Sequence, residues 1–267
     1  MQYQFKTKIL TFFDRRQNYL SDKWASYFPI YDFYFSRFKN KKINLLEVGT
    51  QNGGSLEAWY GYFKSANVIV GSDINLKCSL LKFKSKKIKL IIGDIKNNAI
   101  RKKILGLAKG FDIIIDDGSH KSLDINSTFL FFYPFLNPGG IYLIEDLHCS
   151  YWRRYGGGLL KKDSSIDFLK LFVDIINFES WGMTFKKIKS LRFGYSGTNK
   201  NIQVNKFRDI ESIHFHNSVC VIIKGHGPNA IGQRVITGKK ALVNANLPKS
   251  GASFEPEPQR LKRSFFN

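Results

Sequence analysis

The chain has 267 residues, 43% of them hydrophobic and 15% aromatic, which suffices for a packed core and excludes bulk disorder. Its 42 Lys and Arg against 21 Asp and Glu give a net charge of +21, a balance that suits a nucleic-acid or anionic-membrane partner. The basic residues are scattered along the chain rather than gathered into one stripe. We therefore interpret them as compositional bias and keep nucleic acid as the less favoured partner.

The three cysteines have no close spacing, which excludes a disulfide framework and a cysteine zinc site and favours a reducing compartment. The N-terminus lacks the apolar core of a signal peptide. No run approaches the ~20 apolar residues that span a bilayer. These features predict a soluble, cytoplasmic protein without a membrane partner.

Residues 1–40 are predicted to form an N-terminal helical segment, because aromatic residues recur at helical spacing between Trp24 and Phe38. Residues 21–23, Ser-Asp-Lys, have the composition of a helix cap, and Pro29 predicts a kink or a restart. This segment is expected to lie across a central domain.

From residue 43 onward, short apolar runs alternate with helical stretches. Strands are predicted at 43–48, 68–71, 88–92, 113–115 and 141–144, with helices at 55–63, 99–108, 123–136 and 166–178. Residues 210–216 and 218–223 indicate an antiparallel hairpin. The order predicts an α/β, Rossmann-like, doubly wound, mostly parallel seven-stranded sheet that ends in this hairpin. The domain is expected to span 41–225, followed by a polar tail at 226–267.

The first strand ends in a glycine-rich turn that indicates a cofactor site. Ligands of doubly wound sheets bind at the carboxyl ends of the strands, and here Glu47 is followed by Gly49, Gly53 and Ser55. The glycine spacing differs from the G-x-G-x-x-G dinucleotide fingerprint. Glu47 would repel a pyrophosphate but suits the sulfonium and ammonium groups of S-adenosylmethionine, which is the predicted cofactor.

Further carboxylates end the next strands and extend the predicted cofactor site. Asp73 is placed to accept hydrogen bonds from ribose hydroxyls, and Asp94 to reach the adenine edge. Asp116, at the end of the fourth strand, completes this set.

The fourth and fifth strands are expected to be neighbours, which would bring Asp117, Glu145 and Asp146 together. Three unneutralised carboxylates in one small space repel one another by several kcal/mol. A hard divalent cation removes this repulsion, and an all-oxygen set suits Mg²⁺. Such an ion could bind vicinal hydroxyls and acidify the one to be alkylated.

His120, three residues beyond Asp117, is the predicted general base, since histidine exchanges protons near neutral pH. Taken together, these residues predict a Mg²⁺-assisted O-methyltransferase.

The two segments 116–120 (DDGSH) and 145–152 (EDLHCSYW), with the turn after Glu47 and the segment around 21–31, resemble the metal-dependent sugar O-methyltransferases of macrolide biosynthesis, the mycinose-pathway type. The resemblance covers roughly residues 20–225. It implies that Asp117, Glu145 and Asp146 bind magnesium, that His120 is the base, and that the acceptor is a sugar or a glycosylated small molecule.

His148, Tyr151 and Trp152 are predicted substrate contacts, since aromatic walls suit sugar rings. Three alternatives stay open: an RNA methyltransferase that uses the basic surface, a cephalosporin-hydroxylase-like enzyme of the same fold, and a binding protein without catalysis. The sequence does not identify the acceptor, the hydroxyl, the role of the tail or the oligomeric state, and a homo-oligomer is compatible with it.

Overall fold

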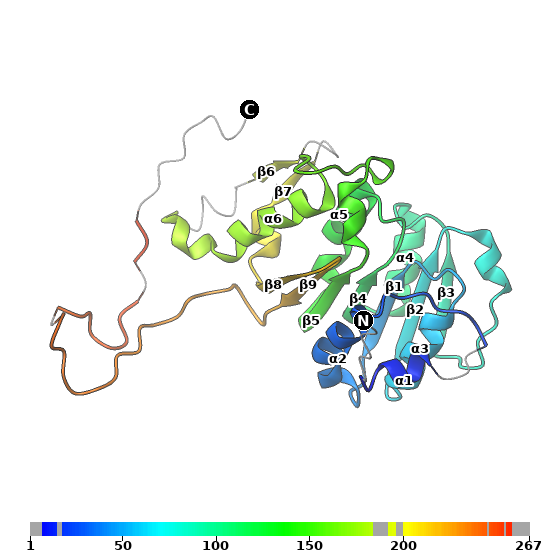
Figure 1. The fold of residues 1–267 in the computed structure, drawn as a ribbon, viewed down its shortest axis with the longest axis horizontal. Coiled ribbons are helices and arrows are strands. Elements are labelled where there is room, and N and C mark those ends of the chain that lie inside the picture. Colours follow the sequence, from blue (N-terminus) through cyan, green and yellow to red (C-terminus); the bar gives the residue numbers. More distant parts are fainter. Residues whose placement is uncertain are drawn as a thin grey trace, which may run out of the picture.

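The structure, a computed structural model, describes residues 7–14, 18–183, 192–195, 200–244, 246–253 and 255–257. Its centre is a seven-stranded sheet with the order β3-β2-β1-β4-β5-β9-β8 (Figure 1). The strands are β1 (Asn44–Val48), β2 (Val68–Asp73), β3 (Ile88–Ile92), β4 (Phe111–Asp116), β5 (Leu136–Ile144), β8 (Ile210–His216) and β9 (Val219–Lys224). The first five run parallel, whereas β9 is antiparallel to both β5 and β8. The predicted fold class is confirmed.

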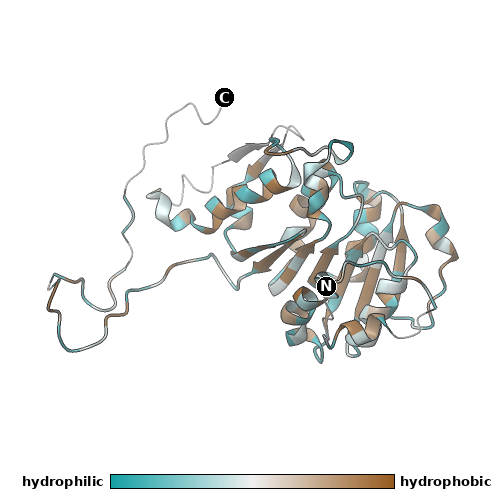
Figure 2. Ribbon diagram, viewed as in Figure 1, coloured by the Kyte–Doolittle hydropathy of each residue, from teal (hydrophilic) through white to brown (hydrophobic). Residues whose placement is uncertain are grey.

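Helices cover both faces of the sheet, and the central strands are coloured mostly as hydrophobic (Figure 2). The strand side chains alternate between two cores. Leu45, Ile113 and Leu143 face the aromatic core beneath the first three helices. Leu46, Ile114 and Tyr142 face the opposite core. The helices are α1 (Leu10–Phe13), α2 (Tyr27–Phe35) and α3 (Gly54–Tyr62) for the first core, and α4 (Asn98–Leu107), α5 (Ser122–Phe132) and α6 (Ser165–Ile176) for the second. Burial on both faces explains why the strands are continuous apolar runs.

The strand order reverses at β1, which pairs with β2 on one side and β4 on the other. Connections that diverge at such a point leave a crevice at the carboxyl ends of the strands, where ligands of doubly wound sheets bind. The loops after β1, β4 and β5 therefore meet at one edge of the sheet, and they carry the predicted site residues.

Three local predictions are wrong. Residues 21–23 do not cap a helix, because α2 begins at Tyr27, after an N-cap at Ser26. Pro29 causes no restart, since it is the third residue of α2, where a backbone N–H has no helical acceptor. The helix predicted to reach 136 ends at Phe132, because Pro134 cannot donate a helical hydrogen bond, and Leu136 already begins β5. The sequence also did not predict the small sheet of β6 (Arg192–Tyr195) and β7 (Lys200–Gln203).

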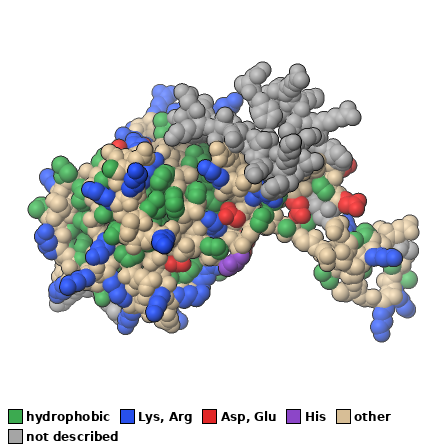
Figure 3. Space-filling model, turned by 180° about the vertical axis from the view of Figure 1, so that it is seen from behind, with side chains coloured by type: hydrophobic (Ala, Val, Ile, Leu, Met, Phe, Trp, Pro, Cys, Tyr) green, Lys and Arg blue, Asp and Glu red, His purple; other side chains and the backbone are tan. Residues whose placement is uncertain are grey.

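The segment after β9 extends away from the sheet, and its described residues form neither helix nor strand (Figure 1). Lys and Arg side chains are dispersed over the face shown in Figure 3 rather than gathered into one stripe. Among the described residues, no helix is both long and apolar enough to span a membrane.

Candidate active site

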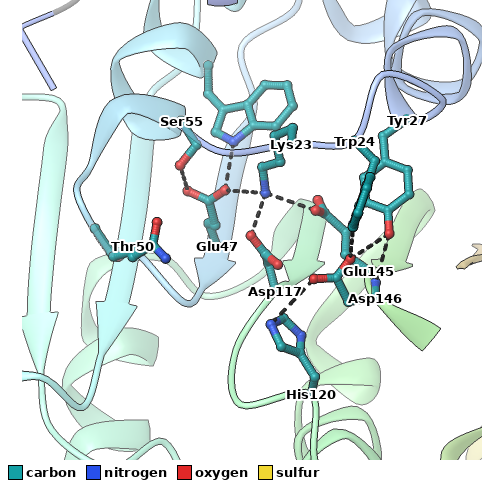
Figure 4. A network of polar contacts seen from close by, with 12 residues as sticks. Lys23, Trp24, Tyr27, Glu47, Thr50, Ser55, Asp117, His120, Glu145 and Asp146 are labelled. Atoms are coloured by element: carbon teal, nitrogen blue, oxygen red, sulfur yellow. Dashed lines mark hydrogen bonds and ion pairs between the residues drawn. The ribbon is translucent and has the colours of Figure 1, made fainter. Parts of the chain in front are cut away.

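Three acidic side chains from neighbouring strand ends surround a buried lysine (Figure 4). Glu47 is the last residue but one of β1, Asp117 follows β4 and Glu145 follows β5. The Lys23 ammonium donates to Asp117 Oδ2 and, at 2.9 Å, to Glu145 Oε2, and it lies 3.8 Å from Glu47 Oε1. The predicted meeting of Asp117 and Glu145 is thus observed, but a side chain of the protein already neutralises part of their charge.

Lys23 is the main residue that the sequence analysis missed, since residues 21–23 were interpreted as a helix cap. The lysine side chain is only 4% exposed. Burial by itself would lower the pKa of Lys23, but the carboxylates of Asp117, Glu145 and Glu47 raise it well above its ordinary value. The ammonium is therefore a permanent positive charge within the acidic cluster.

Glu47 is the member of this cluster that connects β1 to α3. Its carboxylate accepts hydrogen bonds from Ser55 Oγ at 2.7 Å and from Trp59 Nε1 at 3.1 Å, both on α3. The side chain is fully buried, which raises its pKa. The structure thus places Glu47 and Ser55 in a pair that joins β1 to α3, with Glu47 close to Lys23.

Glu145 is held from two sides by the N-terminal segment. Tyr31 on α2 donates to Glu145 Oε1 at 2.7 Å, and Lys23 donates to the other oxygen. Burial first, and then the nearby charge of Asp117, raise the pKa of Glu145 to about 8. Both carboxylate oxygens of Glu145 therefore have donors within the protein.

Asp146 and His120, from the loops after β5 and β4, face each other (Figure 4). Asp146 Oδ1 accepts hydrogen bonds from Tyr27 Oη at 2.6 Å and from Trp24 Nε1 at 3.2 Å, while Oδ2 lies 3.5 Å from His120 Nε2. Both residues have a left-handed backbone, each with φ of 55°. Such conformations are costly for residues other than glycine and concentrate at functional sites.

One oxygen or nitrogen atom each from Asp117, His120 and Asp146 lie within 4.8 Å of one another. Two carboxylates and an imidazole at this spacing fit a divalent cation. Glu145, predicted as the third carboxylate ligand, belongs to the same acidic cluster, but its oxygens point to Tyr31 and Lys23. The residues therefore fit a metal, and Glu145 can join only if it exchanges the Lys23 contact.

A cleft beside this cluster has the predicted cofactor carboxylates in its wall. Asp73, Asp94 and Asp116 all line it, and Ile74 and Ile95 contribute apolar surface. Asp73 Oδ2 accepts from the backbone N–H of Thr50 at 2.9 Å and of Gln51 at 2.8 Å, which fixes the turn after β1. This wall suits a planar base, which would pack between the apolar side chains and have carboxylates at its polar edges.

Within the described part of the chain, the buried Ser72 hydroxyl in this cleft has no hydrogen-bond partner, and neither has the Thr50 hydroxyl in the turn. Buried polar atoms are usually satisfied. The Ser72 hydroxyl thus fits a polar ligand in the cleft, whereas Thr50 is not among the residues that line it.

The two predicted glycines of the turn have packing roles. Gly49 lines the cleft with φ of +93°, and a Cβ there would lie 2.0 Å from the carbonyl oxygen of Asp117. Gly53 has φ of +82°, and a Cβ there would face Leu81 and Phe83 at 3.0 Å. Gly49 thus lets the loops after β1 and β4 touch, whereas Gly53 is set apart from the cleft.

A second cavity opens on the other side of the acidic cluster and shares Gly49, Asp73 and Gly118 with the cleft. Its wall includes His120 and the predicted substrate residues His148 and Trp152. Further lining residues with aromatic or basic side chains, not predicted from the sequence, are Trp24, Tyr27, Arg154 and Tyr155. His148 Nδ1 lies 2.6 Å from the Ser218 hydroxyl. Tyr151 is 48% exposed and is not among the lining residues.

Asp116 gives the site a pH-dependent stability. Burial raises its pKa to about 7, so the stabilisation from its protonated form is complete below pH ~4 and is lost as the pH rises through 7. Asp116→Asn should remove about 3 kcal/mol of the decline in unfolding free energy between pH ~5 and pH ~8. Denaturant unfolding of wild type and Asp116→Asn, in EDTA and across this pH range, measures the difference in unfolding free energy. Parallel pH profiles would contradict the assignment, since the other buried carboxyls are common to both.

In comparisons with known proteins, the chain is similar to sugar O-methyltransferases. No family model matches the chain. It is 31% identical to demethylmacrocin O-methyltransferase of Streptomyces fradiae, over 60% of this chain and 42% of that protein. It is 29% identical to 8-demethyl-8-alpha-L-rhamnosyl tetracenomycin-C 2'-O-methyltransferase of Streptomyces olivaceus, over 78% of this chain and 54% of the relative.

Among solved structures, the chain resembles the MycE methyltransferase of the mycinamycin biosynthetic pathway in complex with Mg and S-adenosylhomocysteine (SAH). The TM-score is 0.64 at 28% identity, over 77% of this chain and 51% of that one. A further MycE structure contains Mg, SAH and mycinamycin VI. The resemblance predicted from the sequence is confirmed, and the chain spans about half the length of the relatives it matches.

Proposed function

We propose that this protein is an S-adenosylmethionine-dependent, Mg²⁺-assisted O-methyltransferase that acts on a hydroxyl of a sugar or a glycosylated small molecule. The observation that carries the proposal is that the cleft and the second cavity, the two hollows of the site, adjoin each other. The cleft and the second cavity share Gly49, Asp73 and Gly118, and Asp117, His120 and Asp146 converge beside this junction. A methyl donor in one hollow would thus face a hydroxyl in the other.

The cleft would bind the cofactor through its acidic wall. Asp94 would contact the adenine edge and Asp73 the ribose, while Ile74 and Ile95 would cover the base. Asp116 would lie near the positively charged end of the molecule, which suits a sulfonium and an ammonium better than a phosphate. The binding of SAH by MycE supports this choice.

Asp117, Glu145 and Asp146 would hold the magnesium ion, with His120 at its edge. When bound, the ion would chelate vicinal hydroxyls of the acceptor and lower the pKa of the one to be methylated. Asp146 is well prepared for this role, because hydrogen bonds from Tyr27 and Trp24 fix one of its oxygens and leave the other toward His120. The relatives bound to Mg support the assignment.

His120 would take the proton from the acceptor hydroxyl. Its Nδ1 is buried without a partner among the described residues, and its Nε2 is 3.5 Å from Asp146, which would orient the ring and stabilise the imidazolium. The oxygen would then attack the methyl group in line, with no covalent enzyme intermediate. Residues 20–24 line the second cavity and would help to exclude water from it. This exclusion and the positioning of cofactor and acceptor would supply most of the acceleration.

The acceptor would lie in the second cavity against Trp24, Trp152 and Tyr155. The apolar face of a sugar ring packs well on such aromatic walls, while its hydroxyls can reach the carboxylates. The relatives are named for acceptors that carry a rhamnosyl or other sugar group, which supports a sugar here. The cytoplasmic location stays a prediction.

Two measurements test the proposed function. Calorimetry should detect binding of SAH to the purified protein, with a separate Mg²⁺ response that EDTA abolishes. Incubation with methyl-labelled S-adenosylmethionine and a panel of glycosides should then give labelled O-methyl products, whereas the 2- and 3-deoxy forms of the accepted sugar should not react. Absence of cofactor binding with and without Mg²⁺ would refute the proposal. Equal labelling of RNA and of sugars would redirect it to the nucleic-acid alternative.

A further inference from the structure

Lys23 lies between Asp117 and Glu145, which the proposed metal site would bring to one ion. Its ammonium contacts Asp117 Oδ2 and Glu145 Oε2, which belong to two of the three carboxylates of the proposed metal site. Only 4% of the Lys23 side chain is exposed, and 21% and 1% of the side chains of Asp117 and Glu145. Water therefore screens these contacts little, and the lysine is a strong internal counter-ion.

The carboxylates around Lys23 carry more negative charge than one ammonium can neutralise. Glu47, Asp117 and Glu145 surround one ammonium, and Asp146 lies beyond Asp117 with no lysine or arginine contact among the described residues. Two cations that both contact Asp117 Oδ2 and Glu145 Oε2 would repel each other strongly, because a buried site screens charges little. A divalent ion that binds through these two oxygens would therefore displace the ammonium.

The backbone that carries Lys23 is anchored independently of this contact. Glu57 on α3 accepts hydrogen bonds from Asn18 N at 3.0 Å and Tyr19 N at 3.3 Å, and Gly54 N donates to Leu20 O at 3.1 Å. Residues 18–20 thus stay on α3 when Lys23 loses its carboxylates. Displacement then requires movement of the Lys23 side chain and the short stretch that follows.

We propose that Lys23 holds the strand-end carboxylates together in the metal-free protein and competes with the divalent cation for Asp117 and Glu145. The proposal rests on the metal site of the proposed function. It makes Lys23 a positioning residue that sets metal affinity: the lysine stabilises the empty site and is released from it when the ion binds.

The test uses Mg²⁺ as the probe on wild type, Lys23→Met and the control Lys96→Met. Lys96 also pairs with a carboxylate, Asp124, at 2.9 Å, but outside the cluster, so both variants remove one charge. Calorimetry should show Mg²⁺ binding about tenfold tighter in Lys23→Met, the effect of removing one competing charge. Without metal its melting temperature should fall, and Mg²⁺ should restore it more than in wild type. Equal or weaker Mg²⁺ binding in a folded Lys23→Met protein would overturn the proposal.

Wild type supplies a second measurement, should Lys23→Met not fold. Labelling of Lys23 by a small amine-reactive reagent, followed by mass spectrometry, should be slow in EDTA and faster in saturating Mg²⁺. Protection that Mg²⁺ leaves unchanged would refute the competition. SAH binding measured on the same samples separates the two ideas, because its absence in wild type would refute the proposed function, whereas its presence with unchanged protection would refute only the role of Lys23.

Discussion

His120→Ala is expected to lower kcat by about 10²- to 10⁴-fold, the usual contribution of a positioned general base, while SAH binding stays as in wild type. The imidazole lines the second cavity and not the cleft, so its loss should spare the cofactor. Its Nε2 lies 3.5 Å from Asp146, and its Nδ1 has no partner among the described residues. The imidazole therefore lies beside the proposed metal site, where the acceptor hydroxyl would bind.

The measurement is steady-state methyl transfer to the best glycoside, together with calorimetry of SAH. His226→Ala is a matched control, since His226 is exposed beyond β9 and outside both hollows. His120→Gln separates two roles, because an amide can orient a neighbour but cannot take up a proton at neutral pH. If His120→Gln and His120→Ala both retained the wild-type rate, His120 would not be the base.

The architecture was predictable because burial determines the sequence pattern of a parallel sheet. In β4 three apolar residues follow one another because each contacts one of the two cores: Ile113, Ile114 and Ile115. The carboxylates of Asp116 and Asp117 come directly after them, where the strand ends. Because the ends of parallel strands share one edge, Asp117, Glu145 and Asp146 could be placed together from the sequence alone.

The detailed pairing could not be predicted, because it depends on contacts between residues distant in sequence. Lys23 and Glu145 are 122 positions apart, and no local spacing links a lysine before a helix to a strand end. The tyrosines did leave a signal: Tyr27 and Tyr31 are one helical turn apart and both donate to carboxylates of the site. The sequence analysis counted the segment around residues 21–31 in the family resemblance but assigned no role to these hydroxyls.

Gly49 illustrates the same limit at the level of one residue. The sequence analysis counted it in the predicted cofactor turn, and the structure adds a second neighbour, the backbone of Asp117, whose carbonyl oxygen is 2.0 Å from where a Cβ would be. A glycine pattern indicates that something approaches closely, but it does not identify the neighbour. The tertiary contact between two loops decides this.

Asp146→Asn is expected to abolish the Mg²⁺ response and to lower kcat about 10³-fold, since a metal ion contributes several kcal/mol to such a reaction. Asparagine keeps the shape, its amide oxygen can still accept from Tyr27 and Trp24, and it tolerates the φ of 55° at this position. It lacks the negative charge that a divalent cation requires. The fold should therefore persist while metal binding is lost.

Mg²⁺ calorimetry, melting temperature and methyl-transfer rate measure this change together. Asp163→Asn is the matched control, because Asp163 also has a positive φ, of 63°, and lies outside both hollows. It should bind Mg²⁺ and turn over as wild type does. An Asp146→Asn protein that bound Mg²⁺ with unchanged affinity would place the ion elsewhere. One that lost Mg²⁺ but kept its rate would show that His120 and the positioning of the acceptor suffice for methyl transfer.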